Sequence, residues 1–425
     1  MSNNLGKGTI GIHGGYSPKS GEPRVLPIYQ SATYKYDDPD TLEALFALKA
    51  EGHLYSRISN PTVGALEDKY TKLEGGVGAV ATASGQSAIL YAVLNLCKAG
   101  DHIISVTSLY GGTVNLFNVH LKNLGIEVSF VEPDASEEEI LSLAKENTKA
   151  IYGETIGNPG LNILDFDKFS SVAKKIQVPL IIDNTVATPY HCNPFEHGAN
   201  IVVHSTTKYS EGHAQTIGGI VVDGGNFDWT NGKFNDFTTP DPSYHGLKYV
   251  ESFGQAAYIV KLRVTLLRDL GACMSPFNAY LTNLGLVTLH LRMERHSKNA
   301  LEIAQWLTTE EKVSWVNYPL LEGSKYYDLA KKYLKGGASG LLTFGVKGGI
   351  ENAKEFSRGL NVIALAVTLG DARSCLLHPA TTSHSQLNEE ELLASGVTPD
   401  LLRLSVGIED AKDLINDISE ALKAI

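Results

Sequence analysis

The sequence predicts an α/β protein with a mainly parallel, seven-stranded sheet that helices cover on both faces, followed by a smaller α+β domain. Short apolar, β-branched runs alternate with helical stretches over residues 63–290. This alternation is typical of a parallel sheet built from strand–helix–strand units. The chain has 425 residues, which is more than one ordinary hydrophobic core requires, so a second domain is expected.

Residues 1–62 are expected to form an extended arm before the large domain. They are rich in Gly, Pro and Tyr, and only residues 41–50 show a clear helical pattern. An extended arm of this kind needs another protein surface to pack against, so the sequence favours a homo-oligomer.

The seven predicted strands of the large domain follow one another along the chain, with helices in the gaps. They cover residues 77–82, 102–106, 127–131, 149–154, 179–184, 201–205 and 218–222. One helix begins with Ser136 and Glu139 at capping-box spacing, where hydroxyl and carboxylate each satisfy a backbone N–H group. Residues 224–249 lack a clear period and are rich in Gly, Asn, Asp, Pro and aromatic residues, which predicts a long surface insertion.

A helical run over residues 281–307 leads into the C-terminal domain, and we place the boundary near residue 290. The strand patterns after it cover residues 313–318, 340–346 and 401–407. An amphipathic helix at residues 412–423 closes the chain. The expected organisation is therefore the arm, an α/β domain (63–290) and an α+β domain (291–425).

Composition restricts the possible classes of function. The formal net charge is −11 and no long basic block occurs, which argues against nucleic-acid binding. The four cysteines lie far apart, so neither a metal site nor a disulfide framework is predicted. The N-terminus does not resemble a secretory signal, and no run approaches the ~20 apolar residues that span a bilayer. We therefore expect a cytoplasmic protein that acts on small molecules.

Lys208 is the first candidate for a chemical role. It follows the apolar strand at residues 201–205 and the hydroxyl groups of Ser205 and Thr207. Open α/β sheets place their ligands at the carboxyl ends of parallel strands. Burial and nearby cations at such a position lower the pKa of an amine and make it a nucleophile. The alternative is a solvated lysine after a strand.

An earlier predicted strand ends in a carboxylate, because Asp183 follows the apolar residues 179–182. A buried carboxylate needs a positive partner. The protonated ring nitrogen of pyridoxal phosphate would supply one, and this pairing makes the cofactor an electron sink. A helix cap or a metal ligand is the alternative role for Asp183.

Residues 83–88 join the first strand to an apolar helix. A helix N-terminus presents free N–H groups and a positive dipole end, so a phosphate can lie beside Ser84. Ser205 and Thr207 would add hydroxyl donors from the other side. The alternative is that Ser84 is only a helix N-cap.

Two further segments place aromatic and cationic groups near the expected ligand. Tyr110 follows the second strand and could stack on a planar cofactor, although a single tyrosine could also belong to the core. Tyr55 and Arg57 end the arm with a phenol and a guanidinium that suit phosphate oxygens. An arm reaches a neighbour's site more naturally than its own.

Together these segments closely resemble the Cys/Met-metabolism family of pyridoxal-phosphate enzymes over essentially the whole chain. The resemblance implies the aspartate aminotransferase-like fold of pyridoxal-phosphate-dependent transferases. It also implies that Lys208 carries the cofactor covalently, Asp183 pairs with the ring nitrogen and Tyr110 stacks on the ring. The other residues that it places on the cofactor are Ser84, Gly85, Gln86, Asn158, Thr185, Ser205, Thr207 and, from a partner subunit, Tyr55 and Arg57.

The same resemblance implies a substrate site around Arg403. This residue matches the family's arginine that clamps the α-carboxylate of the substrate through two hydrogen bonds. Thr368, Tyr55 and Asn158 are the other expected substrate contacts. Lys208 would then act as general base, and Tyr110 would steady the leaving group or transfer a proton.

Within the family, the insertion and residues 193–200 and 370–384 look most like O-acetylhomoserine sulfhydrylases. Gly112 stands where methionine γ-lyases typically carry Cys, and Val367 stands where cystathionine enzymes typically carry Glu. The implied reaction converts O-acetyl-L-homoserine and sulfide to L-homocysteine and acetate, in methionine biosynthesis, within a homotetramer built as a dimer of dimers. Cystathionine γ-synthase or γ-lyase activity, and a non-catalytic cofactor-binding scaffold, are the alternatives.

Overall fold

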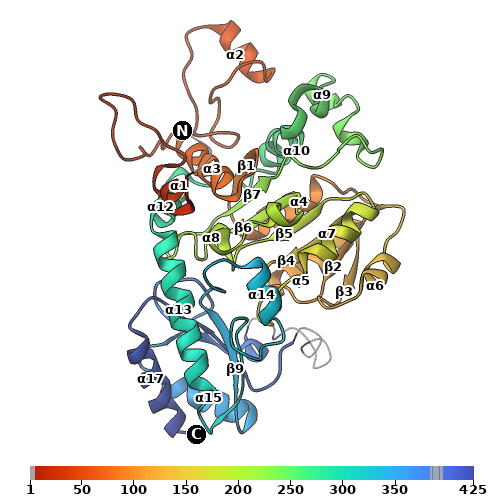
Figure 1. Ribbon diagram of the computed structural model, residues 1–425. Coiled ribbons are helices and arrows are strands. Elements are labelled where there is room, and N and C mark those ends of the chain that lie inside the picture. The colour runs from red at the N-terminus through yellow and green to blue at the C-terminus, as the bar shows by residue number, and fades with distance from the viewer. Residues whose placement is uncertain (1–4, 383–384, 386–391, 393–395) are drawn as a thin grey trace.

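The computed structural model describes residues 5–382, 385, 392 and 396–425. The last two residues of segment 370–384 therefore lie outside the described residues. Figure 1 shows the N-terminal arm at one end of the molecule, the large sheet in the middle and a smaller sheet at the other end. No helix among the described residues is both long and apolar enough to cross a membrane.

The N-terminal arm contains two helices before the large domain begins. Helix α1 (Lys7–His13) was not predicted, because its sequence KGTIGIH contains glycines that favour other conformations. Helix α2 (Pro39–Phe46) lies in the region where a helix was expected. Helix α3 (Pro61–Glu74) then starts with Asn60 as N-cap, whose side chain accepts two backbone N–H groups.

The large sheet confirms the mainly parallel, seven-stranded prediction. Its order is β1-β7-β6-β5-β4-β2-β3. The strands are β1 (Gly78–Thr82), β2 (His102–Val106), β3 (Glu127–Val131), β4 (Thr148–Glu154), β5 (Leu180–Asp183), β6 (Ile201–Ser205) and β7 (Gly219–Asp223). Only β7 runs antiparallel, against both β1 and β6. Every residue of β2 and β7 is buried, so helices cover both faces of the sheet.

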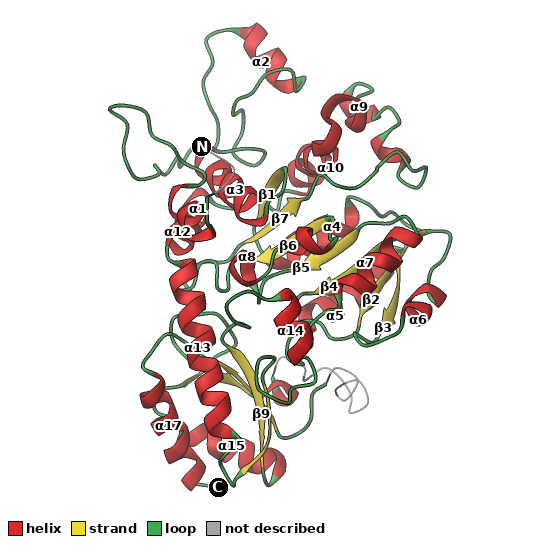
Figure 2. Ribbon diagram, in the orientation of Figure 1, coloured by secondary structure: helices red, strands yellow, loops and turns green. Residues whose placement is uncertain are grey.

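Helices occupy the connections between these strands (Figure 2). They are α4 (Gly85–Leu94), α5 (Gly111–Asn115), α6 (Glu137–Ser142), α7 (Phe166–Lys175) and α8 (Thr188–His191). Helices α9 (Tyr249–Phe253), α10 (Ala257–Leu262) and α11 (Arg268–Leu270) follow β7. The capping box predicted at Ser136 and Glu139 is confirmed at the start of α6, with both side-chain hydrogen bonds present.

The segment 224–249 is not simply a surface insertion. Trp229, Phe234 and Phe237 are buried. The Trp229 ring stacks on Phe237 and on Tyr258 of α10, at centroid distances of 4.6 and 5.4 Å. The expectation of a surface loop was wrong for these side chains, because the polar turns between them conceal an aromatic cluster that has no regular period.

The predicted helical run at residues 281–307 is two helices, α12 (Pro276–Val287) and α13 (Leu289–Leu307), separated at Thr288. We propose this break as the domain boundary expected near residue 290. The second sheet has the order β10-β11-β12-β9-β8. Its strands are β8 (Val313–Asn317), β9 (Leu341–Val346), β10 (Ala364–Leu365), β11 (Cys375–Leu377) and β12 (Leu401–Ser405).

Three more helices complete this part of the chain: α14 (Tyr327–Tyr333), α15 (Gly349–Gly359) and α17 (Ala411–Lys423). Strands β8, β9 and β12 and helix α17 confirm the sequence prediction to within about two residues at each end, the usual uncertainty of such boundaries. Strands β10 and β11 were not predicted, because segments of 2 and 3 residues carry no periodic signal.

Candidate active site

The carboxyl ends of the central strands and the C-terminal sheet enclose a cavity of about 210 Å³. Twelve of the fourteen predicted site residues line it. They are Ser84, Gly85, Gln86, Tyr110, Asn158, Asp183, Thr185, Ser205, Thr207, Lys208, Thr368 and Arg403. The first ten come from the large domain and the last two from the C-terminal part, so the cavity lies between the two sheets.

Tyr55 and Arg57 do not line this cavity. The Arg57 guanidinium lies 5.2 Å from the centroid of the Tyr55 ring and donates a hydrogen bond to the carbonyl of Arg268. The Tyr55 side chain is exposed. Within one chain, the arm therefore keeps both residues away from their own cavity, and their action on a neighbour's site stays a prediction.

Lys208 lies in the turn that follows β6, where the sequence predicted a nucleophile. Burial lowers the pKa of Lys208, and the positive charge of Arg403 lowers it further. Both effects favour the neutral amine, which is the form that attacks a carbonyl carbon or accepts a proton.

Asp183 ends β5 and accepts a hydrogen bond from the backbone N–H of Thr185 at 2.9 Å. Thr185 in turn accepts the N–H of Ser205 through its hydroxyl at 2.8 Å, which joins the ends of β5 and β6. Burial raises the pKa of Asp183. A cationic partner in the cavity would reverse this shift and stabilise the carboxylate.

Glu154 is a cavity residue that the sequence analysis missed. It ends β4 and is the cross-strand partner of Asp183. Its Oε1 accepts the backbone N–H of Tyr110 at 2.8 Å. Burial, and secondly the nearby Asp183, raise the pKa of Glu154 well above its ordinary value, which favours the protonated form of this carboxyl. Its position at the end of a strand, like that of Asp183, could have identified it as a candidate site residue.

The N-terminus of α4 forms one wall of the cavity. Ser84 is the N-cap, and its hydroxyl accepts the N–H of Ser87 at 3.2 Å. The N–H groups of the first helical turn have no acceptor within the helix. A Cβ atom at Gly85 would lie 2.6 Å from Cβ of Ser205, so only glycine permits this close approach. The result is a set of backbone and hydroxyl donors suited to a phosphate.

Arg403 forms the opposite wall. Its Nη1 donates to Oδ1 of Asn158 at 3.1 Å, and its Nη2 donates to the carbonyl of Thr368 at 2.8 Å. Among the described residues, Nε has no acceptor and no carboxylate pairs with the guanidinium. A buried guanidinium that is held only by neutral groups is suited to bind an anionic ligand.

These features fit pyridoxal phosphate. Lys208 offers an amine for the aldehyde, Asp183 a carboxylate for the ring nitrogen, and the start of α4 a cradle for the phosphate. Tyr110 supplies an aromatic ring at the same cavity.

Comparison with known proteins agrees with this fit. The model of the Cys/Met metabolism PLP-dependent enzyme family matches residues 8–423. The chain belongs to this family. Pyridoxal phosphate is accordingly its cofactor.

Relatives in the family cover the whole chain. An O-acetyl-L-homoserine sulfhydrylase of Leptospira meyeri is 48% identical over 100% of this chain and 98% of its own. O-acetyl-L-homoserine sulfhydrylase 1 of Thermus thermophilus is 47% identical over 97% of this chain and 99% of its own. A crystal structure from Campylobacter jejuni, which carries N'-pyridoxyl-lysine-5'-monophosphate, superposes with a TM-score of 0.96 at 39% identity, covering 99% of this chain and 100% of that one.

Proposed function

We propose that the protein is an O-acetylhomoserine sulfhydrylase, which converts O-acetyl-L-homoserine and sulfide to L-homocysteine and acetate. The observation that carries the proposal is the single cavity that holds Lys208, Asp183 and an Arg403 without a carboxylate partner among the described residues. The likeness to the sulfhydrylases of Leptospira meyeri and Thermus thermophilus supports the choice of substrate.

Bound pyridoxal phosphate supplies an electron sink that makes the hydrogen on the amino-bearing α-carbon acidic. Arg403 binds the α-carboxylate of the amino-acid substrate through two parallel hydrogen bonds. Neutral Lys208 accepts the α-proton on Nζ and returns it later, since its lowered pKa permits both steps. Asp183 holds the ring nitrogen in its protonated form through its negative charge.

Tyr110 lies beside this proton path, and its backbone is fixed by Glu154. Its phenol is in a position to hold the acetate leaving group or to carry a proton to it. Ile217 and Val367 line the cavity with exposed apolar side chains. An apolar entrance suits sulfide in its small, weakly hydrated protonated form, whereas a charged amino-acid thiol such as cysteine would lose hydration there.

The assembly belongs to the same proposal. Tyr55 and Arg57 complete the phosphate site of a neighbouring subunit, which requires at least a dimer, and a tetramer is a dimer of such dimers. The separation of both side chains from their own cavity supports this exchange. The cytoplasmic location expected from the sequence is also part of the proposal.

The test is a visible absorption spectrum of the purified protein, followed by addition of O-acetylhomoserine with and without sulfide while homocysteine is assayed. We expect a cofactor band that changes with substrate, and homocysteine only when sulfide is present. Release of an α-keto acid without sulfide would instead indicate a lyase, and cystathionine formed from added cysteine would indicate a synthase. Lys208→Ala should abolish turnover, and retained steady-state activity would contradict the mechanism.

A further inference from the structure

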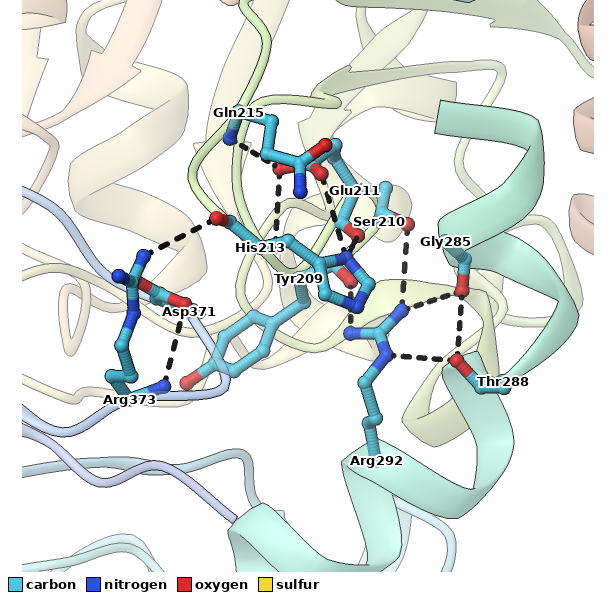
Figure 3. A network of polar contacts seen from close by, with 10 residues as sticks. All are labelled: Tyr209, Ser210, Glu211, His213, Gln215, Gly285, Thr288, Arg292, Asp371 and Arg373. Atoms are coloured by element: carbon cyan, nitrogen blue, oxygen red, sulfur yellow. Dashed lines mark hydrogen bonds and ion pairs between the residues drawn. The ribbon is translucent and has the colours of Figure 1, made fainter. Parts of the chain in front are cut away.

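Arg292, near the start of α13, is a buried guanidinium surrounded by backbone carbonyls (Figure 3). Nη1 donates to the carbonyl of Tyr209 at 2.6 Å. Nη2 donates to the carbonyl of Gly285 at 2.7 Å and makes a longer contact of 3.5 Å with that of Ser210. Nε donates to the hydroxyl of Thr288 at 3.2 Å. One side chain thus joins the residues immediately after Lys208 to the break between α12 and α13.

The charge of Arg292 is retained in this buried place. Burial lowers the pKa of Arg292 to about 10, and the carboxylate of Glu211 acts in the opposite direction. Oε2 of Glu211 accepts the N–H groups of His213 and Gln215, at 3.1 and 3.0 Å, and so closes the turn on itself. The nearby Glu211 side chain thus offsets part of the cost of burying the Arg292 guanidinium.

The turn is shaped to admit this guanidinium. Gly212 has φ of +77°, and a Cβ atom there would lie 2.2 Å from Nη1 of Arg292. On the helix side, a Cβ atom at Gly285 would lie 2.3 Å from the carbonyl oxygen of Glu211. The guanidinium packs on the backbone at Gly212, and backbone packs directly on backbone at Gly285, so the turn after Lys208 cannot shift without disturbing α12 and α13.

The opposite side of the turn is held by the segment that leads away from the cavity residue Thr368. The N–H of Ala372 donates to the carbonyl of Gly212 at 2.9 Å. Arg373 donates from Nη2 to the carbonyl of His213 at 3.3 Å and to the buried Asp371 at 2.8 Å (Figure 3). The C-terminal part of the chain therefore holds the turn on two sides, through Arg292 on one and through Ala372 and Arg373 on the other.

Lys208 depends on this turn for its position. Its own carbonyl accepts the N–H of Gly212 at 2.9 Å. No described residue forms a hydrogen bond or ion pair with its Nζ, so the backbone alone sets where the four-carbon side chain begins. We propose that Arg292 is a positioning residue that fixes Lys208 against the cofactor by holding the turn behind it, an inference that rests on the proposed role of Lys208.

The experiment uses the enzyme loaded with pyridoxal phosphate and three variants. Arg292→Met keeps most of the side-chain volume and removes the charge and the donors, whereas Arg292→Lys keeps the charge. Arg263→Met is the control for loss of a partly buried arginine. Arg263 donates to the carbonyls of Ile58 and Ala79, at 2.9 and 2.8 Å, forms an ion pair with Glu67 at 2.7 Å, and does not line the cavity. The readouts are thermal unfolding, the pH midpoint of the cofactor absorption band without substrate, and kcat and KM.

We expect Arg292→Met to shift the pH midpoint of the absorption band and to lower kcat by about 10- to 100-fold with little change in KM, as for a reacting group misplaced by a fraction of an ångström to one ångström. Arg292→Lys should fall between Arg292→Met and wild type. Arg263→Met should lose thermal stability without moving the midpoint.

Arg292 variants that lose stability but keep the wild-type midpoint and kcat would overturn the inference. Should Arg292→Met fail to fold, Arg292→Lys decides between the same outcomes. Because the absorption band is recorded without substrate, a shifted midpoint in an enzyme that forms no homocysteine would uphold the positioning role while refuting the proposed function.

Discussion

Glu154 offers a direct test of how the cavity distributes its charge. Replacement by alanine removes the acceptor of the Tyr110 N–H, whose hydrogen bond to Oε1 is 2.8 Å long. Replacement by glutamine keeps a side-chain oxygen that can accept this hydrogen bond at the same distance from the backbone, but the glutamine side chain carries no charge at any pH. The two variants therefore separate the hydrogen bond from the ionisation of the carboxyl group.

The expected size of the alanine effect follows from the burial of Glu154, whose hydrogen bond with the Tyr110 N–H is partly buried. A buried donor left without an acceptor costs about 1–3 kcal/mol, so Glu154→Ala should lower the free energy of unfolding by about that amount. Loss of the buried side chain adds to this cost. Glu154→Gln should retain the hydrogen bond and have a free energy of unfolding close to that of wild type at low pH.

The pH dependence of the glutamine variant has a definite sign. Burial raises the pKa of Glu154 well above its ordinary 4.5. At low pH the carboxyl is protonated in both the folded and the unfolded state and costs nothing. As pH rises above 4.5, only the unfolded state releases the proton, so the wild type loses stability until the folded pKa is reached. Glutamine has no such loss.

The assay is urea unfolding of the apoprotein at about pH 5 and about pH 8, at one protein concentration, with wild type measured beside both variants. The stability of Glu154→Gln relative to wild type should increase with pH. Two results would refute the inference that Glu154 has a raised pKa in the folded protein. One is a stability of Glu154→Gln relative to wild type that falls as pH rises, and the other is a glutamine variant as unstable as the alanine variant.

Three other substitutions test separate parts of the structure. Arg403→Lys should raise KM for O-acetylhomoserine about 10- to 100-fold, the value of one lost charged hydrogen bond, in steady-state assays; an unchanged KM would exclude a carboxylate contact. Gly85→Ala should weaken cofactor binding in a fluorescence titration, because its Cβ would lie 2.6 Å from Ser205, and undiminished affinity would contradict the phosphate cradle. Asn60→Ala should reduce the free energy of unfolding by about 0.5–2 kcal/mol through loss of the α3 N-cap, and urea unfolding equal to wild type would argue against that cap.

Much of the cavity could be predicted because its residues stand at strand ends. Lys208 follows β6 and Asp183 ends β5, and each strand is a recognisable apolar run. Glu154 ends β4 in the same way, yet it was not predicted as a site residue, since its importance depends on its register with Asp183. Register is a property of paired strands and cannot be seen in one of them.

Arg292 shows a second limit of the sequence. In the sequence, Arg292 looks like any other charged residue of α13. Its hydrogen bond with the carbonyl of Tyr209 cannot be predicted from the sequence, because the two residues lie far apart in the chain. The break at Thr288, which brings Gly285 to the guanidinium, was also missed, because both helices carry apolar residues in a continuous pattern. Such features depend on contacts between distant segments.

The sequence by itself determined the strands of the large sheet and β8, β9 and β12, the mainly parallel sheet, the likeness to cofactor-dependent enzymes and the types of reactive group, because periodicity, turn residues and motifs are local. Only the tertiary structure decided the strand order, the cavity between the two sheets, the separation of Tyr55 and Arg57 from that cavity, and the hydrogen bonds of Arg292 to the turn after Lys208. These depend on packing between segments far apart in the chain, where the free energy of burial and pairing outweighs local preference.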